Sequence, residues 1–285
     1  MFKKASIYCY KPGAESGLEE NLEAGKFLPV TDNAIKSSGW SPVRDGELCV
    51  TSHGHKLLVF TIEKKVIPGS ALKLAVEERC SELEEQQGFA PGKKARAEIK
   101  ERVFDELLPR ALPTRASTKV WIDTERGRII IDSSVVGTLE LIIRALVMAA
   151  PFELSYLPAW GGAEMNIWMV AEGDDLPAGY TIDDAVQMEY PGGRGTVVAF
   201  KKADLEEDAV QMHLAAGAIV TKMALTFNSR VSFTLQPIHQ LLNIKLLDVT
   251  KDNQVAKDAD EFENNFILMA LELRALIDSL SEQSE

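Results

Sequence analysis

The most constraining feature of this sequence is a helical stretch that lies between two β-hairpin signals. Residues 47–68 contain two β-rich runs that meet at a glycine and end at a proline, which is typical of a hairpin. From 69 to 108 the apolar residues recur at helical spacing, interrupted over 88–94 by a segment that contains glycine and proline. A second hairpin signal follows at 117–133. This order predicts an α+β fold with antiparallel sheets and packed helices, from which a pair of helices protrudes as a tip.

Similar signals continue toward both ends of the chain. Alternation predicts a strand at 4–10, and a further strand is expected around "MNIWMVAE" at 165–172. The final helix, from about Asp260, has an apolar seam that suits packing against its own sheet or, alternatively, a dimer interface. Further helices are expected at 17–26, 134–150 and 204–216, and further strands at 196–202, 218–227, 230–236 and 241–249.

We expect the chain to divide into three parts. The first is a central α/β region, formed by 1–66 together with 117–165. The second is the helical tip at 67–116, and the third is a base region at 166–285 that contains the C-terminal helix.

Charge is distributed unevenly along the chain, whose net charge is −12. Such an excess of acid argues against a protein that coats nucleic acid with its whole surface, because long-range repulsion opposes the approach of a polyanion. Residues 93–128 nevertheless hold ten basic and six acidic side chains, whereas 251–285 hold three basic and nine acidic ones. By default, the basic residues of the second tip helix form an ordinary solvated face.

Targeting and cysteine patterns predict a cytoplasmic protein without disulfides. No run of eighteen apolar residues exists, so we expect no membrane span, and the N-terminus lacks the pattern of a signal peptide. The three cysteines are widely spaced and form no Cys-x-x-Cys pair, which favours reduced structural thiols over disulfides or zinc ligands.

Two histidines lie at the turn of the first hairpin. On one strand face, His53 and His55 would be able to chelate a metal. Histidines beside a turn glycine are more often solvent-facing, so we expect both to face solvent and expect no metal or cofactor.

The second hairpin contains the only enzyme-like arrangement in the sequence. A two-residue loop at Arg126-Gly127 would place Asp123 opposite Ile130 and Trp121 opposite Asp132. Asp123 and Asp132 would then lie diagonally on one face, close enough to share a divalent metal as in nucleases. Alternatively, Asp123 orders the turn and Asp132 caps the next helix, and no catalytic residue is present. The opposite face would be core, made by Val120, Ile122, Ile129 and Ile131.

The order of several motifs resembles the bacterial recombination-associated protein RdgC family over nearly the whole chain. The similar segments are "KKVIPGSALKLAVEER" (64–79), "LLPRA" (107–111), "WIDT" (121–124), "VVAFKKADL" (197–205), "AGAIVTKMAL" (216–225) and "FENNFILMALELRALIDSL" (262–280).

The resemblance implies a protein that binds duplex DNA without sequence preference and associates with the nucleoid. It also implies an elongated, crescent-shaped subunit that forms a ring-shaped homodimer with a positively lined central hole. Such a ring would limit the access of the recombinase RecA to DNA. An acidic protein is able to bind DNA in this way because its positive charge faces inward.

The resemblance also suggests which residues carry these roles. Lys201 and Lys202 match a basic pair in the family and are our first choice for phosphate contacts, although Ala203 replaces a position that is often polar. Leu112 stands where the family places an aromatic residue at the dimer contact, beside Pro113. Further candidates for DNA contact are Arg110, Arg115, Lys119 and Lys222.

Three hypotheses therefore remain open: a ring-forming DNA-binding protein that modulates recombination, a metal-dependent exonuclease that uses Asp123 and Asp132, and a purely structural dimer with a solvated basic face. Salt-sensitive duplex binding favours the first, and magnesium-dependent degradation of DNA favours the second.

Overall fold

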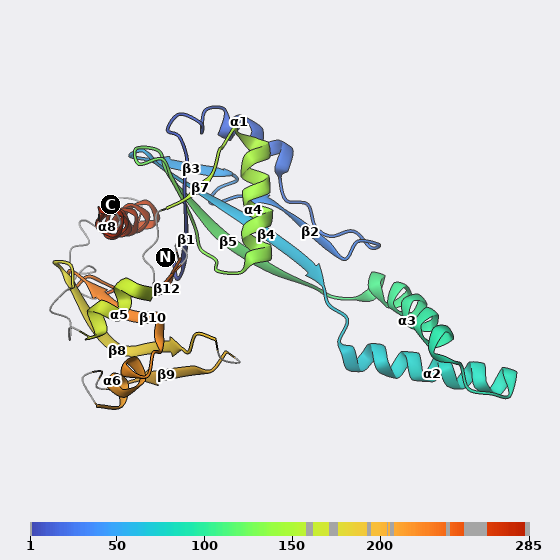
Figure 1. Cartoon of the computed structure of the whole chain (residues 1–285). Coiled ribbons are helices and arrows are strands. Elements are labelled where there is room, and N and C mark those ends of the chain that lie inside the picture. The colour runs from blue at the N-terminus through green and yellow to red at the C-terminus, as the bar shows by residue number, and fades with distance from the viewer. Residues whose placement is uncertain are drawn as a thin grey trace. The chain divides into compact units, whose positions relative to one another are not determined.

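The computed structural model describes residues 2–157, 162–170, 176–192, 195–203, 205, 208–237, 240–247 and 261–282. Its contacts divide the chain into two compact units. The first unit contains Met1–Leu18, Cys49–Leu58 and Lys119–Glu285, and the second contains Glu19–Leu48 and Val59–Thr118. Two strands, β4 (His55–Lys65) and β5 (Pro113–Asp123), contribute residues to both units. Figure 1 labels most of the helices and strands of both units.

The sheet of the first unit is built around β1 (Ala5–Cys9), which is buried along most of its length. One edge of β1 pairs with β6, and the other edge pairs with β12 near its start and with the short β7 near its end. All these pairings are antiparallel, and β3 pairs with the start of β4. The remaining strands follow in the order β12, β11, β10, β8 and β9. The bounds are β3 (Cys49–Ser52), β6 (Arg128–Ile131), β7 (Ser155–Tyr156), β8 (Tyr180–Glu189), β9 (Val197–Lys201), β10 (Ile219–Phe227), β11 (Val231–Gln236) and β12 (Gln240–Leu246).

The first unit also contains the helices α4 (Val136–Ala149), α5 (Gly162–Val170), α6 (Asp208–Ala215) and α8 (Glu261–Glu282). The apolar seam expected in the last helix is confirmed, since most of its residues are buried within the unit. Phe262 lies near the helix start and is half-exposed. The buried residues of α8 are Phe266, Met269, Ala270, Leu273, Leu276, Ile277 and Leu280.

The second unit contains β2 (Lys36–Ser41), which pairs antiparallel with residues 59–64 of β4. Two helices, α2 (Gly69–Gln87) and α3 (Lys93–Leu107), form the predicted helical pair. Gly88 ends α2 with a left-handed φ of 77°, a conformation that glycine adopts without a steric penalty. An ion pair between Arg79 and Glu106 links the two helices at 3.3 Å. Short helices are α1 (Leu18–Asn21), η1 (Leu22–Gly25) and η2 (Leu108–Arg110).

The α+β class and the antiparallel pairing are confirmed, but residues 162–170 form a helix instead of the predicted strand. Met165, Trp168 and Met169 are all buried. Their spacing of three and four residues is a helical pattern that a short apolar run does not distinguish from a strand. No helix in the described part of the chain is long and apolar enough to cross a membrane. The three-part division of the chain, the crescent and the ring stay predictions.

The second hairpin forms, but its predicted register is wrong. Asp123 lies opposite Arg128, and Trp121 lies opposite Ile130, so the loop has four residues instead of two. Packing against the N-terminal strand explains the longer loop. Gly127 accepts a hydrogen bond from the backbone N–H of Tyr10 at 2.8 Å, and a Cβ on this glycine would lie 2.5 Å from the Tyr10 carbonyl oxygen. The predicted core face is nevertheless fully buried.

Candidate nucleic-acid interface

Two predicted DNA contacts, Lys201 and Lys222, lie on the same face of the sheet in the first unit. Lys201 on β9 is opposite Ala185 of β8, and Lys222 on β10 is opposite Gln187 of β8. Side chains that are directly opposite, or two positions apart on one strand, share a face of a sheet. The two lysines therefore flank β8 from either side at neighbouring rows.

The other face of these strands belongs to the hydrophobic core. Val186 and Met188 of β8 and Val220 and Met223 of β10 are buried there. Helix α5 packs against β10, where the Asn166 side-chain oxygen accepts a hydrogen bond from a backbone N–H of β10 at 2.7 Å. The side chains that alternate with these apolar residues are half-buried or exposed. The face that carries Lys201 and Lys222 is thus the more open side of the sheet within this unit.

Lys245 on β12 lies on the same face and was missed by the sequence reasoning. It is opposite Ser232 of β11, which is opposite Thr226 of β10, and Thr226 is four positions from Lys222. The sequence did contain a local signal for Lys245. It stands between two buried residues, Ile244 and Leu246, and this period-two pattern indicates that Lys245 points to the open face of the strand. We call Lys201, Lys222 and Lys245 together the lysine face.

Carboxylates on this face limit its positive charge. Glu189 lies two positions from Gln187 on β8, and Asp183 receives the Thr226 hydroxyl at 3.0 Å. Burial raises the pKa of Asp183 above its usual range, although the hydrogen bond from Thr226 opposes this effect. The binding of an anion to this face would therefore depend on a small number of lysines.

Lys202 follows Lys201 at the end of β9 and has an uncommon backbone conformation. Its φ is 53°, in the left-handed region that disfavours residues with a Cβ. The next residue, Ala203, donates its backbone N–H to the Asp184 carbonyl at 3.3 Å. The conformation redirects the chain after β9 and leaves the Lys202 side chain exposed.

Lys119 lies elsewhere in the sheet of the first unit. It belongs to β5, and the strands β6, β1, β12 and β11 separate β5 from β10 in the strand order. Its carbonyl accepts a hydrogen bond from the backbone N–H of Asp132 at 3.0 Å. Lys119 therefore does not join the lysine face.

Arg110 and Arg115 belong to the second unit and have different surroundings. Arg110 is exposed in η2. Arg115 contacts the buried carboxylate of Glu63 at 2.6 and 2.8 Å and lies 4.9 Å from the ring centre of Phe27. The backbone N–H of Val30 also donates to Glu63, and together these contacts lower the pKa of that carboxyl. Arg115 thus has a structural partner within its own unit.

The predicted dimer contacts also belong to the second unit. Leu112 is 81% exposed, and Pro113 begins β5 and is exposed as well. At this exposure the side chain of Leu112 is accessible to another surface.

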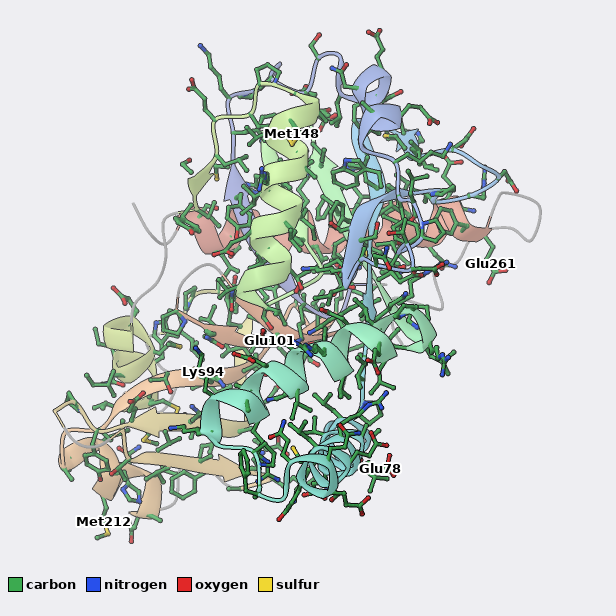
Figure 2. The ribbon with its side chains drawn as sticks, turned by 90° about the vertical axis from the view of Figure 1, so that its right-hand side faces the viewer. Glu78, Lys94, Glu101, Met148, Met212 and Glu261 are labelled. Carbon is green, nitrogen blue, oxygen red and sulfur yellow. The ribbon has the colours of Figure 1, made fainter. Side chains whose placement is uncertain are left out.

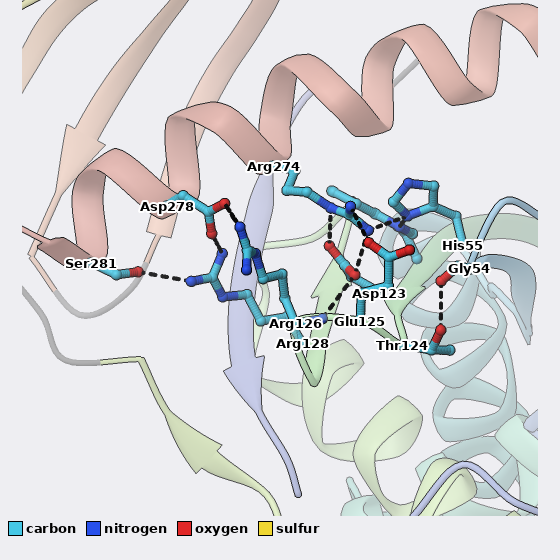
Figure 3. Close-up of polar contacts among 11 residues, drawn as sticks. Gly54, His55, Asp123, Thr124, Glu125, Arg126, Arg128, Arg274, Asp278 and Ser281 are labelled. Carbon is cyan, nitrogen blue, oxygen red and sulfur yellow. Dashed lines mark hydrogen bonds and ion pairs between the residues drawn. The ribbon is translucent and has the colours of Figure 1, made fainter. Parts of the chain in front are cut away.

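Asp123, the first residue of the nuclease hypothesis, is engaged by an arginine from the C-terminal helix (Figure 3). The Arg274 guanidinium contacts both oxygens of Asp123 at 2.7 Å and one oxygen of Glu125 at 2.6 Å. Asp123 is 1% exposed and also accepts the backbone N–H of Arg126 at 3.1 Å, so it orders the turn as one alternative expected. A fixed guanidinium thus occupies the side of the carboxylate that a metal would need.

His55 is buried at 1% exposure, so the expectation that it faces solvent is wrong. Its Nδ1 accepts a hydrogen bond from the Trp121 indole N–H at 3.1 Å. Burial and the nearby Arg274 guanidinium lower the pKa of His55, against a smaller effect of Asp123 and Glu125. The turn geometry itself was predicted, but the packing of β5 beside β4 decides the environment of the histidine.

Asp132 lies apart from Asp123 in both position and partners. Its Oδ1 accepts the backbone N–H groups of Lys3 and Lys4 at 3.0 and 2.9 Å, and burial raises its pKa. Asp132 does not cap the next helix, since α4 has Val135 at its N-cap and no side-chain cap hydrogen bond, and the Ser133 hydroxyl accepts the backbone N–H of Val135 at 3.2 Å in the turn before it. No group of three metal-ligating side chains occurs among the residues that the structure describes.

Comparisons with known proteins agree with the resemblance in the sequence. The family model described as "Putative exonuclease, RdgC" matches residues 1–283. The recombination-associated protein RdgC of Cupriavidus necator is 34% identical over 272 residues, covering 93% of this chain and 90% of that protein. That of Bordetella pertussis is 34% identical over 293 residues, covering 98% and 97%, and that of Janthinobacterium sp. (strain Marseille) is 32% identical over 289 residues, covering 98% and 96%. The chain therefore belongs to the RdgC family of recombination-associated proteins.

Proposed function

We propose that this chain is a DNA-binding protein of recombination, which holds duplex DNA without reading its sequence. The observation that carries the proposal is the lysine face: Lys201 and Lys222 flank one strand on an open side of the sheet. Lysine is a compact point charge that contacts phosphate without recognising a base. The surface therefore suits the repeating backbone of DNA better than a specific sequence.

Binding would be driven by local charge in an otherwise acidic chain. Each phosphate that a lysine neutralises releases a condensed counterion, so affinity should fall as salt rises. Asp183 and Glu189 would hold affinity down on a single subunit. A homodimer would double the number of lysines and, closed as a ring through contacts such as Leu112, would retain DNA by enclosure as well as by charge.

Such a protein would act on recombination by occupying DNA. Duplex DNA held in the ring is less accessible to RecA, and this competition requires no direct contact between the two proteins. The same activity would place the protein at the nucleoid, where duplex DNA is concentrated.

The exonuclease alternative has no support in the geometry of its two carboxylates. Asp123 is held by Arg274, and Asp132 is held by backbone N–H groups. A two-metal or one-metal nuclease needs carboxylate oxygens that are open to a cation and to water.

Two measurements on the full chain test the proposal. Fluorescence anisotropy with two labelled duplexes of unrelated sequence should give similar affinities, with log K falling by about 0.9 per log unit of salt for each phosphate contacted. Affinity that is independent of salt, or that differs strongly between the duplexes, would contradict the proposal. Incubation of end-labelled duplex with magnesium should leave the DNA intact, and degradation that Asp123→Asn abolishes would revive the nuclease.

A further inference from the structure

A cavity in the first unit opens beside α4, and its lining contains no residue of the lysine face. Its volume is about 200 Å³, and it lies among β1, α4, β7 and the start of β12. Most of its lining is apolar or aromatic. The lining residues are Ser6, Ile7, Tyr8, Val136, Leu139, Glu140, Ile143, Tyr156 and Gln240.

The strand pairing explains why a hollow exists at this place. β12 ends its pairing with β1 at Ser6, and β7 begins its pairing at Tyr8, along the same edge of β1. The edge of β1 at Ile7 therefore lies between two short partners, and the side chains of Ser6 and Tyr8 project to one face of the strand while that of Ile7 projects to the other. Leu139 and Ile143 of α4 cover the gap between the two partners. Because no strand fills the gap, a hollow remains under the helix.

The size of the cavity limits what it can hold. At roughly 30 Å³ per water, the volume equals six or seven water molecules, which is the scale of one leucine or phenylalanine side chain. Pockets that hold nucleotides or similar ligands usually measure about 300–1,000 Å³. An anchoring side chain fits this space, and a nucleotide does not.

The rim of the cavity combines exposed apolar groups with one carboxylate. Val136 and Tyr156 line the cavity and are 66% and 63% exposed, and the Tyr156 ring lies 5.4 Å from that of Tyr8. Glu140 is the acidic lining residue, is exposed, and has no ion-pair partner within the described part of the chain. Tyrosine rings and a carboxylate together attract a cation.

The apolar surface continues along α4 beyond the cavity. Val147 lies three turns after Val136 on the same side of the helix, and Met148 at the end of α4 is 78% exposed (Figure 2). Exposed apolar residues that gather around a hollow and are flanked by charge mark protein interaction sites more often than chance exposure. This extent exceeds what a small molecule in the cavity would cover.

We propose that the cavity beside α4 is an anchor site for a partner protein, which inserts an aromatic or leucine side chain next to a lysine or arginine. The apolar side chain fills the space among Tyr8, Leu139 and Ile143. The adjacent cation lies against Glu140 and Tyr156 at the rim. The cation of the partner thus complements the carboxylate of Glu140.

The test uses three short peptides as probes of this chemistry. Methyl NMR of the isoleucine and leucine groups is followed during titration with acetyl-Gly-Phe-Lys-Gly-amide and with matched peptides in which Glu replaces Lys or Ala replaces Phe. The Phe-Lys peptide should shift Leu139 and Ile143, the Phe-Glu peptide should bind about two- to fivefold more weakly, and the Ala-Lys peptide should not shift them.

Variants at exposed positions separate the site from the rest of the protein. Glu140→Lys should abolish the preference for Phe-Lys, and Val136→Asp should weaken both Phe peptides, whereas Glu153→Lys serves as a charge-matched control on the same unit. DNA binding should stay unchanged in all three. Equal binding of the two Phe peptides, no shift at Leu139 and Ile143, or loss of self-association in Val136→Asp, which would assign the surface to a second copy of this chain, would each overturn the proposal.

Discussion

Arg274 and Asp123 form a bidentate ion pair, with both guanidinium contacts at 2.7 Å, although they are 151 residues apart in the sequence. The pair joins the C-terminal helix to the second hairpin. Arg126 and Arg128 strengthen this junction through Asp278, at 2.9 Å from Arg126. Asp123, one of the two carboxylates that first suggested catalysis, therefore holds α8 in place.

Removing Arg274 should destabilise the protein strongly. Arg274→Met would leave the buried carboxylate of Asp123 without its charged partner, which costs about 3–5 kcal/mol in comparable buried pairs. Urea denaturation followed by circular dichroism measures the loss. As a control, Arg230→Met breaks a more exposed pair with Glu272 on the same helix and should cost at most about 1 kcal/mol. Equal losses in the two variants would show that the buried pair has no special role.

His55 should make the stability depend on pH between neutrality and mild acid. Its folded pKa is lowered, so the unfolded chain binds the proton more readily, and the free energy of unfolding should fall as pH drops below about 6.5. Protonation would also place an N–H on Nδ1 against the Trp121 indole N–H and the Arg274 guanidinium. Thermal melts at pH 5, 6 and 7 measure this dependence.

His55→Gln is the matched variant, because the amide oxygen still accepts from Trp121 but does not titrate in this range. The variant should lose less stability than the native chain between pH 7 and pH 5. An identical pH profile in both proteins would assign the acid sensitivity to other groups, such as the carboxylates.

Replacing Lys202 should weaken DNA binding without reducing the stability of the protein. Asparagine tolerates a left-handed φ better than lysine, so Lys202→Asn should keep or raise stability by up to about 1 kcal/mol. The same change removes one cation and should reduce the salt slope of DNA binding by about 0.9. Lys11→Asn, at an exposed site off the lysine face, is the control and should leave the slope unchanged. A destabilised Lys202→Asn with unaltered binding would refute both parts.

Local signals predicted most helices and hairpins of this chain. The turn at His53-Gly54 and the end of α2 at Gly88 use residues with positive φ that are readable from sequence. Strand β8 was missed because Asp183 and Asp184 interrupt its alternation of apolar and polar residues. The longer loop of the second hairpin was missed because Tyr10, distant in sequence, fixes its geometry.

The candidate site was predictable only in part for the same reason. The Lys201-Lys202 pair is visible as a motif, whereas the shared face of Lys201, Lys222 and Lys245 depends on pairing among five strands, β9, β8, β10, β11 and β12. The partner of Asp123 lies in the last helix, and no local pattern indicates it. The type of each side chain is readable from the sequence, but tertiary packing decides which other side chains surround it.

Arg115 should prove structural, in contrast to its predicted contact with DNA. Arg115→Leu leaves the Glu63 carboxylate with only the Val30 N–H and removes the stacking on Phe27. We expect a lower urea midpoint and little change in the salt slope of DNA binding. Arg110→Leu, exposed in the same unit, is the control for stability and should keep the native midpoint. A stable Arg115→Leu protein with weakened DNA binding would restore the original assignment.

The lysine face predicts that reversing its central charges abolishes DNA binding without unfolding the protein. Lys201→Glu with Lys222→Glu replaces two attractions by two repulsions next to Asp183 and Glu189, so duplex affinity should fall by more than about tenfold at moderate salt. Both side chains lie on the open side of the sheet, so the thermal midpoint should move little. The matched control reverses Lys73 and Lys93 in the second unit, which changes the net charge equally. If the control loses as much affinity as the double variant, attraction comes from overall charge, and if neither does, the DNA path avoids this face.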